Sequence, residues 1–307
     1  MIISRRAILA LAATVALAAS ACSAPTPGAS PSSGPSGSQA APGASVSPGT
    51  TASESASETL EPASYGERSA EITNAWLPLK PGTKFRYDGS ARDGQRKIAR
   101  RIELVATGLT KVVAGITTRA VWVVDSEDGS VTEKKISFYA QAADGTVWYL
   151  GEHPETFDDN EFAQAHTWLH GVADAKAGIA MPANPHVTGD SFSQGWAPAV
   201  DFMDRGRVVA QDQKVCLQGT CYEPVVVIEE FSAAEPDAAQ VKSYARDVGL
   251  VQVGWRGNDR EREELQLTAV TTLSAKDLST LHAAVRAAEA HAYIVSKAVY
   301  GDTPPLV

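Results

Sequence analysis

Short runs of alternating polar and apolar residues recur through most of the chain, separated by turn-forming pairs. Successive side chains of a β-strand point to opposite faces, so this alternation predicts strands with one buried face. The pairs Asp93-Gly94, Asp128-Gly129 and Asp144-Gly145 are typical of tight hairpins between such strands. The predicted strands comprise residues 84–87, 97–105, 118–124, 131–139, 146–150, 207–216, 221–231, 240–245, 250–254 and 263–272.

Strands that follow one another through short turns favour an antiparallel meander. With this many strands, we expect a curved sheet or a half-open barrel. The predicted fold class is therefore mainly β, with a β domain over residues 67–273.

The chain ends in one predicted α-helix, residues 274–301, packed on the β domain. Ser274 and Asp277 form a capping-box pattern at its start. Gly301 and the two prolines after it are typical of a helix end. Two helix histidines, His282 and His291, lie nine residues apart and are expected at the surface. The apolar stripe that would face the sheet consists of Leu278, Leu281, Val285, Ala288, Ala292 and Val295.

Two of the three cysteines, Cys216 and Cys221, flank the loop Leu-Gln-Gly-Thr. A four-residue loop containing glycine is a hairpin connection, which would place the two cysteines opposite each other. Outside the cytoplasm such a pair oxidises, so we predict a structural disulfide.

The first 21 residues are typical of a secretory signal peptide. Arg5 and Arg6 precede a short apolar run and then the small residues Ser20 and Ala21. The arginine pair leaves two export routes open, general secretion and twin-arginine export.

The segment Ala19-Ser20-Ala21-Cys22 resembles the lipobox of bacterial lipoproteins, although Ala19 stands where leucine is usual. The resemblance implies acylation of Cys22, including palmitate, and anchoring at the extracytoplasmic face of the cell membrane. Two acyl chains hold a protein there stably. The alternative is plain secretion with a free thiol on Cys22.

Residues 22–66 are dominated by Ser, Ala, Pro, Gly and Thr and have few large apolar side chains. Such a composition cannot bury enough surface to offset chain entropy, so we expect a disordered tether.

The net charge of −9, with 36 acidic and 27 basic residues, is unfavourable for binding nucleic acid. No phosphate loop, dinucleotide fingerprint or Gly-x-Ser-x-Gly motif occurs, and no cofactor or catalytic residue is predicted.

Several motifs resemble a family of uncharacterised bacterial secreted proteins and lipoproteins that is common in actinobacteria. The resemblance covers most of residues 74–301 and implies no stated activity. The motifs are LPLKPGT at 77–83, DGTVWYLGE at 144–152, AKAGIAMPANP at 175–185, GDSF at 189–192, VGLV at 248–251 and VYG at 299–301.

The segment 152–170 is rich in acidic residues and histidines. If it were helical, His166 and His170 would share a face as two zinc ligands do, and Asp158 or Asp159 could supply a carboxylate. The alternative is a solvated acidic loop over the sheet.

Six aromatic residues near the family motifs could line a pocket in a curved sheet. The alternative is ordinary core and rim packing. These residues are Trp148, Tyr149, Trp168, Phe192, Trp196 and Trp255.

The sequence therefore predicts a lipid-anchored cell-surface protein whose β domain binds a lipid, a glycan or an envelope protein without catalysis. A metal-assisted envelope hydrolase and a structural surface protein without a small ligand remain as alternatives.

Overall fold

The computed structural model describes residues 59–61, 64–233, 235 and 237–307. The predicted signal peptide, Cys22 and most of the predicted tether lie outside the described residues. Among the described residues, no helix combines the length and hydropathy needed to cross a membrane.

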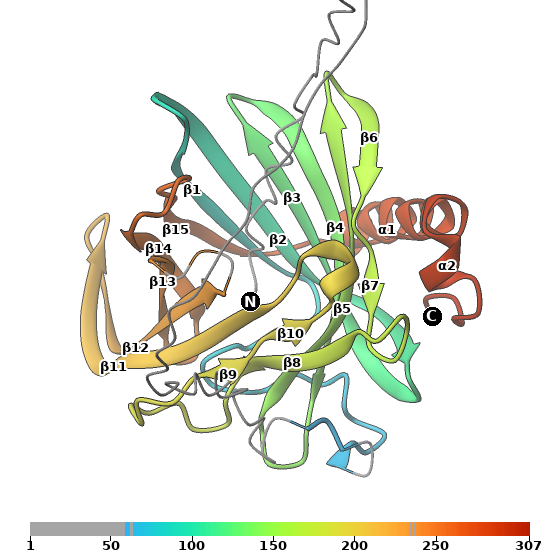
Figure 1. Ribbon diagram of the computed structural model, residues 1–307, viewed down its shortest axis with the longest axis horizontal. Coiled ribbons are helices and arrows are strands. Elements are labelled where there is room, and N and C mark those ends of the chain that lie inside the picture. The colour runs from blue at the N-terminus through green and yellow to red at the C-terminus, as the bar shows by residue number, and fades with distance from the viewer. Residues whose placement is uncertain (1–58, 62–63, 234, 236) are drawn as a thin grey trace, which may run out of the picture. The chain divides into compact units, whose positions relative to one another are not determined.

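The described residues form one curved antiparallel sheet that stays open (Figure 1), which confirms the predicted mainly β fold. Its strand order is β10-β8-β5-β4-β3-β2-β1-β15-β14-β13-β12-β11-β9, and β6 and β7 pair with β5. The strands are β1 Thr83–Asp93, β2 Arg96–Val113, β3 Ile116–Glu127, β4 Ser130–Gln141, β5 Val147–Asp158, β6 Glu161–Ala165, β7 Trp168–Leu169, β8 Lys176–Met181, β9 Phe192–Ser193, β10 Gly195–Trp196, β11 Asp204–Leu217, β12 Thr220–Ser232, β13 Ala238–Ala245, β14 Gly249–Gly257 and β15 Glu264–Thr272.

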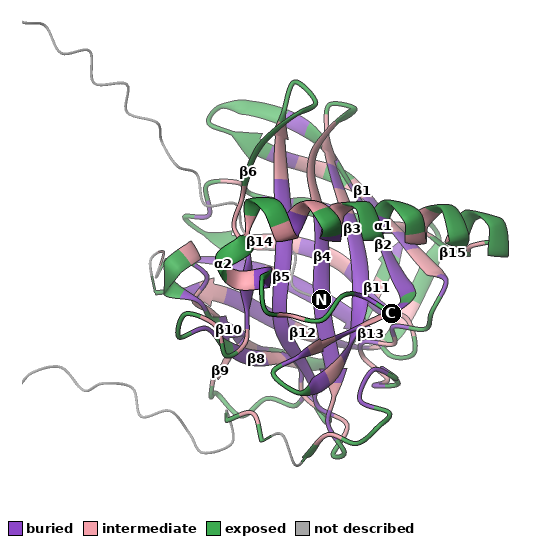
Figure 2. Ribbon diagram, turned by 90° about the vertical axis from the view of Figure 1, so that its right-hand side faces the viewer, coloured by how far each residue is buried: buried purple, intermediate pink, exposed green. Residues whose placement is uncertain are grey.

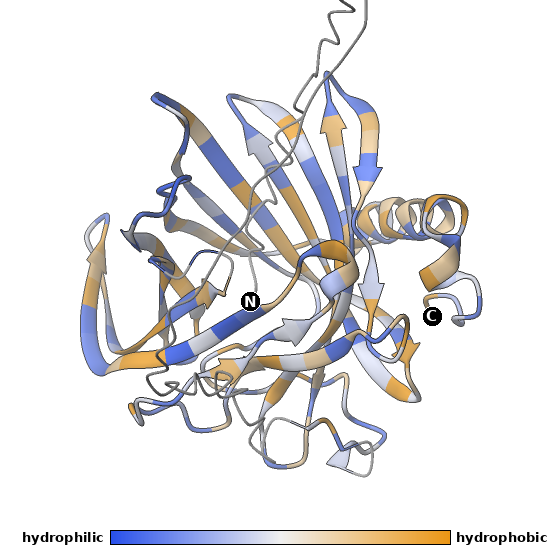
Figure 3. Ribbon diagram, in the orientation of Figure 1, coloured by the Kyte–Doolittle hydropathy of each residue, from blue (hydrophilic) through white to orange (hydrophobic). Residues whose placement is uncertain are grey.

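The first five strands form the expected meander, and the Asp-Gly pairs lie at its turns. At the β3–β4 turn, Asp128 and Gly129 have φ values of 48° and 91°. Two positive φ values at the centre of a two-residue turn match the right-handed twist of the flanking strands. The alternation that predicted these strands is visible as bands of opposite hydropathy along β1 to β5 (Figure 3).

One short segment, residues 192–196, supplies both terminal strands of the sheet. Within it, β9 pairs with β11 and β10 pairs with β8. Between them, the backbone N–H of Gln194 donates to the carbonyl of Asp204 at 2.8 Å. The two ends of the sheet therefore meet at this segment. The sheet still counts as open because β8 and β11 do not pair directly with each other.

The concave face of the sheet carries one apolar core, to which Tyr87, Leu104, Val121, Tyr149 and Val253 belong. Buried ionic side chains lie beside it. Lys242 pairs with Glu230, and Lys135 with Glu152 at 3.2 Å. Buried charges persist only when paired, so the fold depends on these contacts.

The C-terminal helix covers the opposite, outer face of β2 to β5 (Figure 2). It comprises α1 (Ala275–Val295) and α2 (Lys297–Tyr300), separated at Ser296. Ser274 accepts a hydrogen bond from the backbone N–H of Asp277 at 3.1 Å, which confirms the predicted cap. Val285 and Ala292 are buried as the stripe predicted, whereas Val295 is exposed. A short 3-10 helix, Pro198–Val200, precedes β11.

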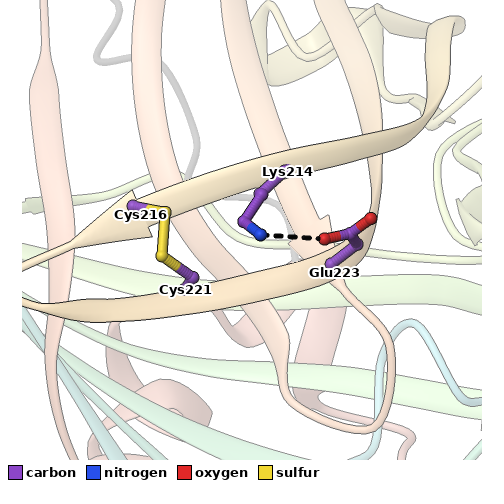
Figure 4. The surroundings of a disulfide bond; sticks show 4 residues. All are labelled: Lys214, Cys216, Cys221 and Glu223. Carbon is purple, nitrogen blue, oxygen red and sulfur yellow. Dashed lines mark ion pairs between the residues drawn. A yellow bond between two sulfur atoms is a disulfide. The ribbon is translucent and has the colours of Figure 1, made fainter.

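Cys216 and Cys221 form the predicted disulfide near the tip of the β11–β12 hairpin (Figure 4). The two residues are direct partners across the ladder. Beside them, the exposed side chains of Lys214 and Glu223 form an ion pair at 3.2 Å. The hairpin tip therefore has one covalent and one ionic link between its strands.

Candidate functional site

A groove of about 960 Å³ opens on the sheet beside the point where β14 and β15 separate. Two strand pairs that are distant from each other in sequence, β1 with β2 and β14 with β15, contribute to it, together with Asp128 of the β3–β4 turn. Its lining residues are Asp88, Gly89, Ser90, Lys97, Ile98, Ala99, Asp128, Gln252, Val253, Gly254, Trp255, Glu264, Leu265 and Gln266.

The groove forms where β14 and β15 separate. These strands share only two residue pairs, Gln252↔Gln266 and Val253↔Leu265. Beyond them, β14 continues beside β13 as far as Gly257, whereas β15 continues beside β1 as far as Glu264. The divergence of the two strands leaves the groove between them.

The floor of the groove depends on a close approach at Gly89. A Cβ atom on this residue would lie 1.8 Å from the carbonyl oxygen of Glu264. Only glycine therefore allows β1 to lie this close to β15 at the bottom of the groove.

The walls combine hydrogen-bond donors and acceptors. Gln252 and Gln266 are ladder partners, and each amide offers two N–H donors and a carbonyl acceptor. Lys97 adds an ammonium group, and Asp88, Asp128 and Glu264 add carboxylates. This set suits a ligand whose groups both donate and accept, as hydroxyl groups do.

Trp255 supplies the aromatic surface of the groove. Its indole Nε1 donates to Oε1 of Glu264 at 3.3 Å. The guanidinium of Arg262 lies 4.9 Å from the ring centroid, in cation–π geometry. The indole is therefore held from two sides and keeps a defined position.

Two of the three carboxylates of the groove, Asp88 and Asp128, are paired with arginines at its margin. Asp88 contacts Arg86 at 2.8 Å and Arg101 at 2.7 Å. Burial acts to raise the pKa of Asp88, but hydrogen bonds from Arg86, Thr268 and Arg101 outweigh it and hold that pKa below its ordinary value. Asp128 likewise contacts Arg96 at 3.0 Å. The local charge is therefore largely balanced.

A buried ionic cluster supports β15 near the groove from the concave side. Arg100 contacts Asp125 at 2.6 Å and Glu263 at 2.9 Å, and Gln240 donates to Glu263 at 3.0 Å. Burial raises the pKa of Glu263, with Arg100 opposing that shift. Burial alone would lower the pKa of Arg100, but the charges of Glu263 and Asp125 raise it. The cluster ties β2, β3, β13 and the residue before β15 together.

The four metal-ligand candidates do not lie on a helix. Asp158 ends β5 and Asp159 belongs to the turn before β6, whereas His166 and His170 flank β7. His170 accepts a hydrogen bond from the backbone N–H of Ala177 at 3.1 Å. Within the described residues, no group of three or more His, Cys, Asp or Glu side chains could hold a metal ion.

The segment 152–170 is also not a solvated loop. Its first residues, Glu152, His153 and Glu155, are buried in β5. The strand extends past Pro154 because it pairs with β4 on one side and with β6 and β7 on the other.

Of the six aromatic candidates, Trp255 lines the groove and the other five lie elsewhere. Tyr149 and Trp168 pack on each other in the concave core, with ring centroids 5.3 Å apart. Trp148 faces α1 on the opposite side of the sheet. Phe192 packs against Gly206, and Trp196 is exposed.

In part of its fold the chain is similar to two solved structures, both at 10% sequence identity. One, from Bacteroides fragilis, is described as a "putative exported protein with YmcC-like fold"; the TM-score is 0.37, covering 65% of this chain and 100% of that one. The other, from Parabacteroides distasonis, is described as a "putative lipoprotein"; the TM-score is 0.38, covering 64% and 99%. Nothing about function follows from similarity at this level.

The sequence matches no protein-family model and no curated protein. The family resemblance that its motifs suggest therefore stays a prediction.

Proposed function

We propose that the chain is an exported lipoprotein, anchored through Cys22, whose β domain binds a neutral glycan of the cell envelope in the groove. The observation that carries the proposal is that one groove is lined by a fixed indole, Trp255, and by the amides of the ladder partners Gln252 and Gln266. Sugar rings present apolar C–H faces to an aromatic ring and hydroxyl groups to amides, so both kinds of contact are available together.

The charges of the groove support a neutral ligand over an anionic one. Three carboxylates and one ammonium line it. Its lining therefore offers no surplus of positive charge to attract a strongly anionic glycan. Because arginines pair with Asp88 and Asp128, little net charge is left to attract a strong cation.

The structure offers less support for an acyl chain as the ligand. The concave face, which is where a curved sheet would hold a lipid, is occupied by core side chains such as Tyr87, Tyr149 and Tyr244. The groove itself is open and mixed in polarity.

An array of immobilised oligosaccharides, probed with the fluorescently labelled full chain in detergent, tests the binding proposal. The expected result is retention on neutral oligosaccharides and weaker retention on sulfated or uronic-acid oligosaccharides. Retention on the anionic set alone, or on none of the array, would contradict it.

The anchor is tested separately in cells that express the full chain. A clickable fatty-acid probe should label the wild-type chain and fail to label the Cys22→Ala variant. Equal labelling of both chains, or of neither, would exclude the lipid at this position.

A further inference from the structure

Helix α1 contacts the sheet through two histidines that lie near its opposite ends. His282 contacts β2 and His291 contacts β5. Both were expected at the surface, yet each forms a hydrogen bond to the strand beneath. The two bonds differ in the role that the imidazole plays.

At the N-terminal half, His282 is an acceptor. The backbone N–H of Gly108 donates to Nε2 of His282 at 3.2 Å. A protonated imidazole carries hydrogens on both nitrogens and cannot accept this bond. Burial and the nearby Arg286 lower the pKa of His282, so the docked imidazole resists protonation. Once the imidazole is protonated, its hydrogen bond with Gly108 is lost.

The charge that acts on His282 is that of Arg286, which disfavours an added proton on the imidazole. Arg286 lies on the same helix and binds the carbonyl of Leu306. Arg119 on β3 binds the carbonyl of Thr107, next to Gly108. The C-terminal carboxylate belongs to Val307, whose backbone pairs with Thr110 on β2.

At the C-terminal half of α1, His291 of the helix and His153 of β5 both donate hydrogen bonds to Glu155. Oε1 of Glu155 lies 2.7 Å from Nδ1 of His291 and 2.9 Å from Nε2 of His153. An ionised carboxylate only accepts, so both ring nitrogens that face it carry hydrogens. Burial acts to raise the pKa of Glu155, but hydrogen bonds from His153 and His291 outweigh it and lower that pKa. Protonation of either imidazole therefore turns an existing hydrogen bond into an ion pair.

The other nitrogen of His153 can gain a proton without loss of a hydrogen bond. Its Nδ1 lies 2.6 Å from the hydroxyl of Thr167, which lies 2.7 Å from the hydroxyl of Ser296. In neutral His153, Ser296 donates to Thr167 and Thr167 donates to Nδ1. In charged His153, both hydroxyls rotate and the same two bonds run in the opposite direction.

Ionisable groups from every neighbouring element surround this second cluster. Lys134 of β4 is the ladder partner of Glu155. On the helical side, the ring of Tyr300 lies 5.5 Å from that of His153. A separate contact, Lys111 to Glu289 at 2.8 Å, holds the C-terminal half of the helix and contains no imidazole. His166 follows β6 and precedes Thr167 in the chain.

We propose that mild acidification acts differently on the two ends of α1, releasing the His282 end from β2 and leaving the His291 end bound to β5. The direction of the pH effect at each end follows from whether the imidazole there accepts or donates its hydrogen bond. The undocked His282 takes up a proton more readily than the docked one, so docking weakens as the pH falls below about 6.5, the ordinary value. The outer face of β2 around Gly108 would thereby become accessible in acidic surroundings.

Amide hydrogen exchange of the full chain at pH 7.5 and pH 5.5, corrected for the intrinsic exchange rate, tests this. The amide protection factors of residues 275–286 should be lower at pH 5.5 than at pH 7.5. Because pH 5.5 is one unit below 6.5, the fall should be at most about tenfold. Protection over residues 288–300 should stay constant or rise. A fall of equal size in both halves, or in neither, would overturn the proposal.

Two variants separate the imidazoles from general acid effects. His282→Gln keeps an acceptor for Gly108 but does not titrate, so the pH response of residues 275–286 should disappear. His291→Gln should leave the pH response of residues 275–286 intact. It should also remove any rise in amide protection over residues 288–300 at the lower pH. A pH response in His282→Gln equal to that of the wild type would contradict the assignment.

Discussion

The indole Nε1 of Trp255 donates a hydrogen bond to Glu264 at 3.3 Å, across the point where β14 and β15 separate. This contact joins the two strands after their ladder has ended. It also sets the orientation of the aromatic surface in the groove. The proposed ligand site therefore depends on a contact between strand ends rather than on a regular sheet surface.

Replacement of Glu264 by alanine should loosen the indole while leaving the fold intact. Because Glu264 is exposed, the free energy of unfolding should change by about 0.5 kcal/mol or less. Trp255 should become more mobile and glycan binding weaker. Array binding and tryptophan fluorescence anisotropy measure both effects, and Glu264→Gln, which keeps an acceptor, should behave like the wild type.

Replacement of Arg100 by methionine should strongly destabilise the β domain. The change leaves the carboxylates of Asp125 and Glu263 buried without their cation, a loss of about 3 to 5 kcal/mol. Urea unfolding followed by circular dichroism measures it. The neighbouring Arg101→Met is the matched control, because Arg101 is half-exposed and its pair with Asp88 should contribute about 1 kcal/mol or less. Equal effects of the two variants would contradict the assigned role of Arg100.

Loss of the disulfide should have a modest effect. Cys216 and Cys221 close a loop of sequence separation 5, for which the chain-entropy model gives about 2 kcal/mol. Urea unfolding of the Cys216→Ser, Cys221→Ser double variant should show a loss of that size or smaller, with array binding unchanged. Loss of binding would place the hairpin tip in the ligand site and would revise the groove assignment.

Acid should weaken the fold partly through Asp88. The pKa of this carboxyl is lower in the folded chain than its ordinary value of 3.8. Its stabilising contribution is therefore complete above about pH 4 and is lost as the pH falls further. Urea midpoints between pH 6 and pH 3 should fall less steeply for Asp88→Asn than for the wild type. An identical slope would exclude this contribution.

Local sequence patterns predicted much of the fold because the interactions behind them are local. Alternation located strands in the region of β1 to β4, and Asp128-Gly129 matched the φ values of its turn. Cys216 and Cys221 were correctly paired because a four-residue hairpin loop places them opposite each other.

The groove could not be predicted in the same way. It depends on where β14 and β15 stop pairing, which is set by their other neighbours, β13 and β1. The terminal strands β9 and β10 contain two residues each and carry no periodic signal. Trp255 was among the aromatic pocket candidates, but nothing local placed it beside Glu264 of the next strand.

The segment 152–170 shows a second limit of local patterns. Its acidic residues and histidines resemble a solvated loop or a metal site, yet Glu155 is buried because it meets His291 from a helix 136 residues away in sequence. Contacts of this kind depend on tertiary packing and have no signature in either segment alone.

The most direct test of the central claim compares two tryptophan variants of the full chain on the oligosaccharide array. Trp255 lines the groove, whereas Trp196 is exposed outside it. Trp255→Ala should reduce binding to neutral oligosaccharides about tenfold or more, as removal of an aromatic anchor does, and Trp196→Ala should bind like the wild type. Wild-type binding by Trp255→Ala would contradict the account.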